Sequence, residues 1–229
     1  HMAVRNDAGI FDVSHMGEFI VKGTQAFDLI QKVTSNDVSK LEIGEAQYSC
    51  LPNLNGGIVD DLLVYRLSED MCNEGEQAYM LVVNASNMEK DWNWISQFNT
   101  FDARMSNISE RTGLIALQGP KAVKILSKLT DIDVAGLKYY TFTKGIVAGI
   151  SNVLVSATGY TGSGGFELYV ANEDTKPPLG AIIGGGKREK QKKNRPRARG
   201  NFRMEKRVVL FHILPPPRTH HKSIFDLFF

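Results

Sequence analysis

Two adjacent carboxylates stand at the start of an otherwise apolar segment, residues 55–65 (NGGIVDDLLVY). Side chains alternate between the two faces of a β-strand, so Asp60 and Asp61 would face opposite sides, and both sides carry apolar residues. A carboxylate against an apolar surface must be hydrogen-bonded or have a raised pKa. Such an environment is typical of a catalytic or ligand-binding acid. The alternative is that both carboxylates lie at the solvated end of the strand, beside the preceding turn.

A second polar constellation occupies residues 158–170 (TGYTGSGGFELYV), where glycines surround Tyr160 and Thr161 before a strand that carries Glu167. A glycine-rich turn can bring the backbone close to a flat ligand. The segment lacks the Lys-Ser/Thr ending of a phosphate loop and the GxGxxG spacing, which disfavours phosphate binding. An ordinary hairpin turn is the alternative.

A third segment, residues 11–19 (FDVSHMGEF), places His15 and Met16 just before a strand. Nothing in the spacing makes His15 a metal ligand, and a structural role is the alternative to a functional one. Cys50 and Cys72 are not surrounded by metal-ligand spacing either, and we expect two reduced thiols. The sequence therefore predicts no metal site.

The elements that would hold these residues are short strands alternating with helices. Strands are expected at 18–22, 47–51, 58–65, 79–83, 113–117, 153–157 and 166–170. Helices are expected after Thr24, Ser86 and Pro120, the first two being candidate N-caps. Turn signals between consecutive strands indicate hairpins, so the predicted fold class is α+β with antiparallel or mixed sheets and packed helices.

Charge divides the chain into two parts. Residues 1–175 carry 13 Lys and Arg against 22 Asp and Glu, whereas residues 176–229 carry 14 against 3. We therefore expect a mildly acidic body over residues 3–175 and a basic, irregular tail. His1 and Met2 are expected to be a cloning remnant, and no export leader is recognised. The sequence has no apolar run of 18 residues, so no membrane-spanning helix is predicted.

Six segments in this order resemble the T-protein family, the aminomethyltransferases of the glycine cleavage system. They are AVRNDAGIFDVSHMGEF, SNDVSKL, YSCLPNLNGGIVDDLLVYR, LVVNASNMEKDWNWI, LIALQGPKA and GYTGSGGFELYV, within residues 3–173. The resemblance implies an α+β folate-binding domain. It also implies an enzyme that moves a one-carbon unit from an aminomethyl group on a lipoyl carrier protein (H-protein) to tetrahydrofolate, releasing ammonia. The implied location is the bacterial cytoplasm, or the mitochondrial matrix in a eukaryote.

The resemblance also implies roles for individual residues. Asp61, the second acid of the family's DD pair, would polarise the folate nitrogen that attacks the methylene carbon. Glu167 would hold the amino and ring N–H groups of the pterin. Tyr48 and Met16 would line the folate pocket, together with Asn84.

The tail contains one further likeness to the family. Residues 197–206 (RARGNFRMEK) resemble its G-A-R-D-T-L-R-L-E segment, which would place a pterin-contacting arginine at Arg199. Gly200 and Asn201 stand where the family has Asp-Thr. Frame errors in the coding sequence would explain such a tail, and a natural basic extension is the alternative. We expect the family's preceding N-terminal segment and its C-terminal barrel domain to be absent.

Two other functions fit parts of the sequence. A folate-binding relative of the iron–sulfur assembly type would carry a K-G-C-Y-x-G-Q-E motif, but the corresponding stretch is YSCLPNLNGG. The basic tail could bind nucleic acid through phosphates, but it has few interleaved aromatic residues and no recognised module. The sequence thus favours a folate-dependent aminomethyltransferase that uses no specific nucleic acid and no membrane.

Overall fold

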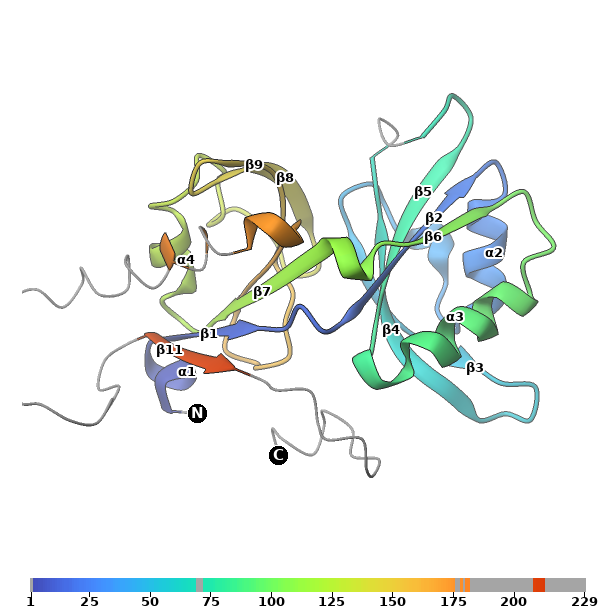
Figure 1. Ribbon diagram of the computed structural model, residues 1–229, viewed down its shortest axis with the longest axis horizontal. Coiled ribbons are helices and arrows are strands. Elements are labelled where there is room, and N and C mark those ends of the chain that lie inside the picture. The colour runs from blue at the N-terminus through green and yellow to red at the C-terminus, as the bar shows by residue number, and fades with distance from the viewer. Residues whose placement is uncertain (1, 69–71, 176–177, 179, 182–207, 213–229) are drawn as a thin grey trace, which may run out of the picture.

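The computed structural model describes residues 2–68, 72–175, 178, 180–181 and 208–212. It consists of two β-sheets and a few short helices (Figure 1). The α-helices are α1 (Met2–Asn6), α2 (Ala26–Val33), α3 (Met88–Gln97) and α4 (Ala122–Leu126). The strands are β1 (Ala8–Asp12), β2 (Gly17–Gly23), β3 (Ala46–Pro52), β4 (Ile58–Arg66), β5 (Gln77–Val83), β6 (Arg104–Asn107), β7 (Thr112–Gln118), β8 (Phe142–Val147), β9 (Ile150–Ser156), β10 (Gly165–Ala171) and β11 (Val208–His212).

Sheet A has the strand order β11-β1-β7-β10-β9-β8. Its neighbours pair antiparallel, except that β11 runs parallel to β1 at the edge. The α4 helix and the segment after it cover the outer face of this sheet, where Ile125 and Leu126 pack with Ile115, Leu117 and Val155. These residues form the core of one half of the molecule.

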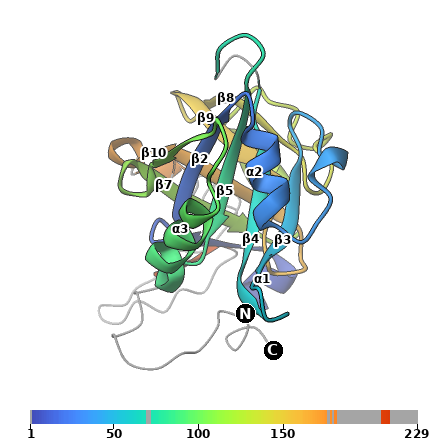
Figure 2. The same cartoon turned by 90° about the vertical axis from the view of Figure 1, so that its right-hand side faces the viewer.

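Sheet B has the strand order β3-β4-β5-β2-β6 and is antiparallel throughout. The α2 and α3 helices cover its outer face, which is turned toward the viewer in Figure 2. In α2 the residues at helical spacing, Ala26, Leu29, Ile30 and Val33, are all buried, because one apolar stripe of the helix meets the sheet.

The inner faces of the two sheets pack against each other. Leu63 and Tyr65 of β4, Val82 of β5, and Leu114 and Tyr169 of sheet A belong to one buried cluster. The hydroxyl groups of Tyr65 and Tyr169 are 3.0 Å apart and form a hydrogen bond across the interface between the sheets. The two sheets are therefore held together by a continuous apolar contact with buried polar links.

The predicted α+β class with antiparallel and mixed sheets is confirmed, as are the two hairpins β3–β4 and β9–β10. The predicted helix caps are wrong. The N-caps are Gln25 for α2 and Asn87 for α3, and neither side chain forms a capping hydrogen bond. The hydroxyl group of Thr24 instead donates to Asp102 at 2.7 Å. Thr24 thus binds Asp102, which is distant in sequence, instead of capping the helix.

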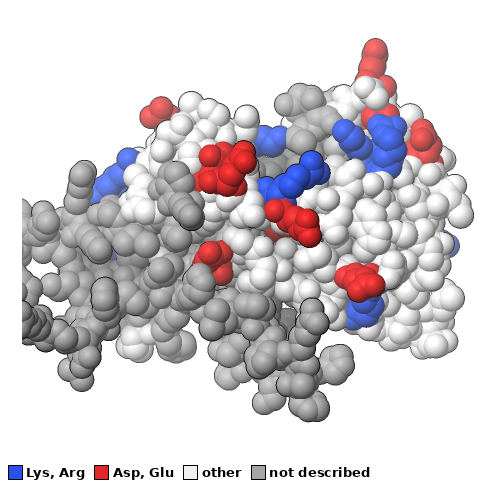
Figure 3. Space-filling model, viewed as in Figure 1, with Lys and Arg blue, Asp and Glu red and all other residues white. Residues whose placement is uncertain are grey.

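Residues 208–212 form the strand β11, which the interpretation of residues 176–229 as an irregular tail did not predict. Most of that tail, including Arg199, lies outside the described residues. Within the described part, no helix has the length and apolar character needed to cross a membrane. Figure 3 shows acidic and basic side chains close to one another over the described part of one face, rather than a continuous basic surface there.

Candidate functional site

A cavity lies between the two sheets, where β1, β4, β7 and β10 approach one another. Its walls are mainly apolar and include Phe11, Val13, Met16, Leu63, Leu114 and Ala116. Its polar side chains are His15, Asp61, Asn84, Gln118, Tyr160, Thr161 and Glu167. An apolar cavity with a few converging polar groups is typical of a small-molecule site.

Asp61 is held by three hydrogen-bond donors from three segments. Its Oδ2 atom accepts from the hydroxyl groups of Tyr48 at 2.8 Å and Tyr160 at 3.3 Å, and its Oδ1 atom accepts from the Asn84 amide at 2.8 Å. Burial and the adjacent Asp61 carboxylate raise the pKa of both tyrosines above the ordinary value, so both phenols stay neutral donors. The carboxylate therefore has a fixed orientation at the rim of the cavity.

The β3–β4 hairpin places Tyr48 beside Asp61. In its register Cys50 pairs with Asp61, and Tyr48 lies two residues before Cys50 on β3, on the same face of the sheet. Tyr48 is 37% exposed, so this contact lies at the mouth of the cavity rather than in its interior.

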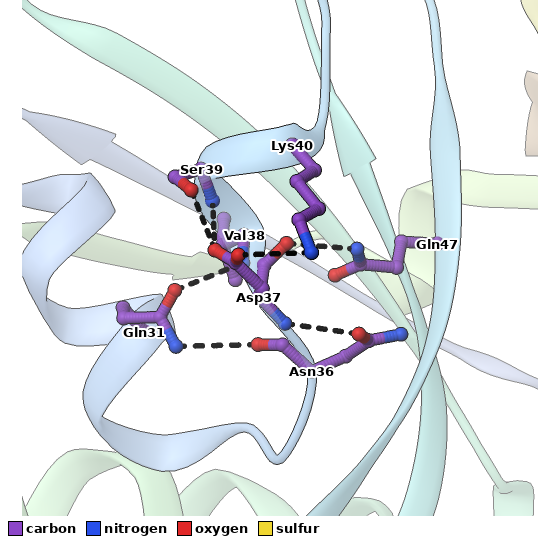
Figure 4. A network of polar contacts seen from close by, with 7 residues as sticks. All are labelled: Gln31, Asn36, Asp37, Val38, Ser39, Lys40 and Gln47. Atoms are coloured by element: carbon purple, nitrogen blue, oxygen red, sulfur yellow. Dashed lines mark hydrogen bonds and ion pairs between the residues drawn. The ribbon is translucent and has the colours of Figure 1, made fainter.

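The loop before β3 is fixed by a network of polar contacts, shown in Figure 4. Asp37 accepts hydrogen bonds from the backbone and hydroxyl group of Ser39, and its carbonyl oxygen accepts from the Gln47 amide at 3.0 Å. The amide of Asn36 donates to the carbonyl oxygen of Tyr48, also at 3.0 Å. The loop thus fixes the strand that carries Tyr48.

Glu167 lies deeper, on β10. The hydroxyl group of Thr158 donates to its Oε2 atom. Burial raises the pKa of Glu167 above its ordinary value, and the hydrogen bond from Thr158 opposes this shift. Behind this pair, Thr158 is hydrogen-bonded to Ser156 and lies 3.2 Å from the hydroxyl group of Tyr65, so the acid is backed by a buried hydroxyl network.

Gln118 organises the glycine-rich loop between β9 and β10. Its amide nitrogen donates to the carbonyl oxygens of Thr158 and Phe166, and its amide oxygen accepts from Thr161 at 2.9 Å. Gly159 has φ +140°, and a Cβ atom there would lie 2.2 Å from the Gln118 side chain. The glycine is therefore needed for close packing of the loop against this amide.

The cavity brings together most residues that the sequence singled out. Asp61, Glu167, Met16 and Asn84 line it, and Tyr48 reaches it through its bond to Asp61. Their predicted roles in folate binding and catalysis stay predictions.

Four polar cavity residues, His15, Gln118, Tyr160 and Thr161, were not selected as binding residues from the sequence. Tyr160 could have been found, because it stands in the glycine-rich turn. Gln118 is the last residue of β7, and neither its type nor its spacing marked it as functional. Burial lowers the pKa of His15, with Asp12 acting in the opposite direction. In the described part of the chain, no three His, Cys, Asp or Glu side chains converge as a metal site would require.

Comparisons with known proteins identify the family of the chain. A sequence profile of the GCVT N-terminal domain matches residues 1–213. The aminomethyltransferase of Flavobacterium psychrophilum is 56% identical over 187 residues, covering 82% of this chain and 50% of its own. That of Phocaeicola vulgatus is 48% identical over 211 residues, covering 92% and 56%. The chain therefore spans about half the length of these curated relatives.

A solved structure gives the same result. The glycine cleavage system aminomethyltransferase T from Bartonella henselae superimposes with a TM-score of 0.70 at 29% identity, over 80% of this chain and 47% of that one. Sequence and structure are in agreement, and this chain belongs to the GCVT N-terminal domain family.

Proposed function

We propose that this chain is the folate-binding part of a tetrahydrofolate-dependent aminomethyltransferase. The reaction moves the one-carbon unit of an aminomethyl group, carried on a lipoyl protein of the H-protein type, to tetrahydrofolate and releases ammonia. The observation that carries the proposal is the cavity between the sheets, with Asp61 held by three donors at its rim and Glu167 deeper inside.

The chemistry of the cavity suits a reduced pterin. Apolar walls such as Leu63, Leu114 and Ala116 favour a flat ring system, because they remove it from water. A pterin carries an amino group and ring N–H groups, and a buried carboxylate can accept two of these donors at once. Glu167 supplies such an acceptor, and Thr158 limits its rotation.

Asp61 would act on the reacting nitrogen. Its carboxylate would accept a hydrogen bond from a ring N–H group of the folate and hold the nitrogen toward the incoming methylene carbon. Tyr48, Tyr160 and Asn84 would prevent the carboxylate from turning away, because each bonds to one of its oxygens. Such fixed orientation lowers the entropic cost of reaching the reactive geometry.

The matching relatives support transfer over the alternative of a folate-binding assembly factor. The curated relatives described above are named aminomethyltransferases, and they are 48–56% identical to this chain. They are bacterial, which supports a cytoplasmic reaction. A lipoyl carrier protein is the partner that this reaction requires.

Isothermal calorimetry with tetrahydrofolate tests the proposal, using a protein of the relatives' full length that carries this chain (the complete enzyme). Glu167→Ala should weaken binding by about 1.5–3 kcal/mol, because the donors of the pterin lose a charged partner. Glu173→Ala, at an exposed glutamate just beyond the same strand, is the control and should bind normally. Unchanged affinity of Glu167→Ala would remove Glu167 from the site, and failure of the wild type to bind would refute the proposal.

A further inference from the structure

Asp91 of α3 is a fully buried carboxyl group outside the cavity. Its side chain is 0% exposed, and neither of its oxygens receives a hydrogen bond among the described residues. An ionised carboxylate in this state would bear the full cost of desolvation. A second carboxyl group faces it, that of Asp60 on the outer face of β4.

Asp60 differs from Asp91 in its partners. The amide of Asn84 donates to its Oδ1 atom and the amide of Asn87 to its Oδ2 atom, both at 3.0 Å. Of two facing carboxyl groups, the one with donors keeps the negative charge and the one without donors keeps the proton. The arrangement thus assigns the shared proton to Asp91, which then donates to Asp60.

Asn84 connects this pair to the cavity. The same amide nitrogen lies 3.0 Å from Asp60 Oδ1 and 2.8 Å from Asp61 Oδ1. One amide group thus bridges the acids on the two faces of β4. Any shift of Asp60 would move Asn84 and, through it, the carboxylate of Asp61.

We propose that Asp91 is a neutral carboxylic acid which donates a hydrogen bond to Asp60 and thereby positions Asp61 through Asn84. Asp91 touches neither the cavity nor a substrate, so it is a positioning residue and not a catalytic one. Its importance for transfer rests on the proposed function, but its protonation state does not.

The surrounding charges agree with this assignment. Burial raises the pKa of Asp91 to about 8, the hydrogen bond to Asp60 and its charge act in the same direction, and Asp61 adds a smaller effect. Lys90, on the same helix, lowers it. The ammonium group of Lys90 is directed to the carbonyl oxygen of Val59, at 2.7 Å. Asp91 is therefore protonated at neutral pH.

The proton itself can be observed. Infrared difference spectroscopy between wild type and Asp91→Asn should show the loss of a protonated-carboxyl C=O band at pH 7. Glu89→Gln, at an exposed acid in the same helical turn, should not change this band. If the difference spectrum shows only an ionised carboxylate, Asp91 is charged and the proposal is wrong.

The pH dependence of stability tests the protonation state of Asp91 independently. The pKa of Asp91 rises from 3.8 to about 8 on folding, so the wild type loses stability as pH rises between these values. Its unfolding constant should rise by about tenfold per pH unit relative to Asp91→Asn, and the ratio should level off above about pH 8. A constant ratio across this range would overturn the assignment.

Single-turnover transfer in the complete enzyme tests the positioning role. Asp91→Asn keeps a donor for Asp60 and should retain the rate, whereas Asp91→Leu removes the donor and should lower the single-turnover rate constant by about 10- to 100-fold. The folate concentration that gives half of the maximal rate should change little. If Asp91→Leu transfers normally while the wild type is active, the inference fails and the proposed function stands.

If Asp91→Leu does not fold, the Asp91→Asn enzyme decides the question. Loss of rate in the folded Asp91→Asn enzyme would overturn the inference. An inactive wild type would refute the proposed function, with the spectrum and the pH dependence still deciding the state of Asp91.

Discussion

At the scale of residues, the site depends on how a few polar groups are held. Asp61 accepts three hydrogen bonds, from Tyr48, Tyr160 and Asn84, and none of these donors is its neighbour in sequence. The sequence could identify Asp61 as an acid in an apolar strand. It could not identify its partners, because they are brought to it by a hairpin, a loop and a second sheet.

Asp61→Asn is expected to separate chemistry from binding. The substitution keeps the shape of the side chain and removes its charge, so single-turnover transfer in the complete enzyme should slow by roughly 10²- to 10⁴-fold. Folate affinity should change much less, because the charge acts mainly on the reacting nitrogen. Asp28→Asn, at an exposed position of α2, should transfer at the wild-type rate. A full rate for Asp61→Asn would contradict the carboxylate mechanism.

The hydroxyl groups of Tyr48 and Tyr160 should contribute unequally to the transfer rate. Tyr48 is 2.8 Å from Asp61 Oδ2 and Tyr160 is 3.3 Å away, so the first makes the stronger hydrogen bond. Tyr48→Phe should lower the transfer rate by about tenfold and Tyr160→Phe by less, which corresponds to about 1.4 kcal/mol for the first. Combining Tyr48→Phe with Asp61→Asn should add little to the effect of Asp61→Asn alone, because both substitutions disrupt the same contact between Tyr48 and Asp61. Additive losses would show that Tyr48 acts independently of Asp61.

At the scale of elements, the sequence predicted what local patterns determine. The strand at Glu18–Lys22 and the hairpins β3–β4 and β9–β10 were found because they combine short apolar runs with clear turn residues. Four strands, β1, β6, β8 and β11, were missed. The β6 sequence RMSN has no apolar period, and β11 is stabilised by pairing with β1, about two hundred residues away in the chain. Long-range pairing leaves no local signal.

Two neighbouring glycines, Gly164 and Gly165, allow a test of how closely β10 approaches β7. A Cβ atom on Gly165, which has φ +137°, would lie 2.4 Å from the carbonyl oxygen of Leu117, whereas Gly164, with φ +71°, has open space around it. Gly165→Ala should therefore destabilise the fold by more than about 3 kcal/mol, because backbone atoms must move. Gly164→Ala should cost only about 1 kcal/mol, the conformational penalty alone. Denaturant unfolding measures both, and equal losses would contradict the close approach of β10 to β7.

At the scale of the whole molecule, the contact between the sheets is the feature that creates the cavity. The inner faces meet through apolar residues, and the same surfaces supply the walls around Asp61 and Glu167. The sequence indicated that both faces of β4 are buried, but it could not indicate which surface each face would meet. Tertiary packing alone decides this.

A buried acid at this contact should make stability depend on pH. Glu18 is 0% exposed, both its oxygens lack hydrogen bonds among the described residues, and burial raises its pKa to about 8. The folded pKa exceeds the ordinary value of 4.5, so stability is lost as pH rises from about 4.5 to about 8. Glu18→Met should therefore gain about 1.4 kcal/mol per pH unit relative to wild type over this range. Glu173→Gln, at an exposed acid, should show no such trend in thermal unfolding across pH.

The strand connectivity also bears on how the chain acquires its structure during synthesis. Sheet B is formed entirely by residues 17–107, whereas sheet A joins β1 near the start of the chain to β7, and then to β11 after residue 207. On the ribosome, all strands of sheet B can pair before β7 and β11, the strands that pair with β1, have emerged. Because distant contacts close slowly, sheet B is the natural first folding unit, and the cavity between the sheets can form only once β7 and β10 have emerged.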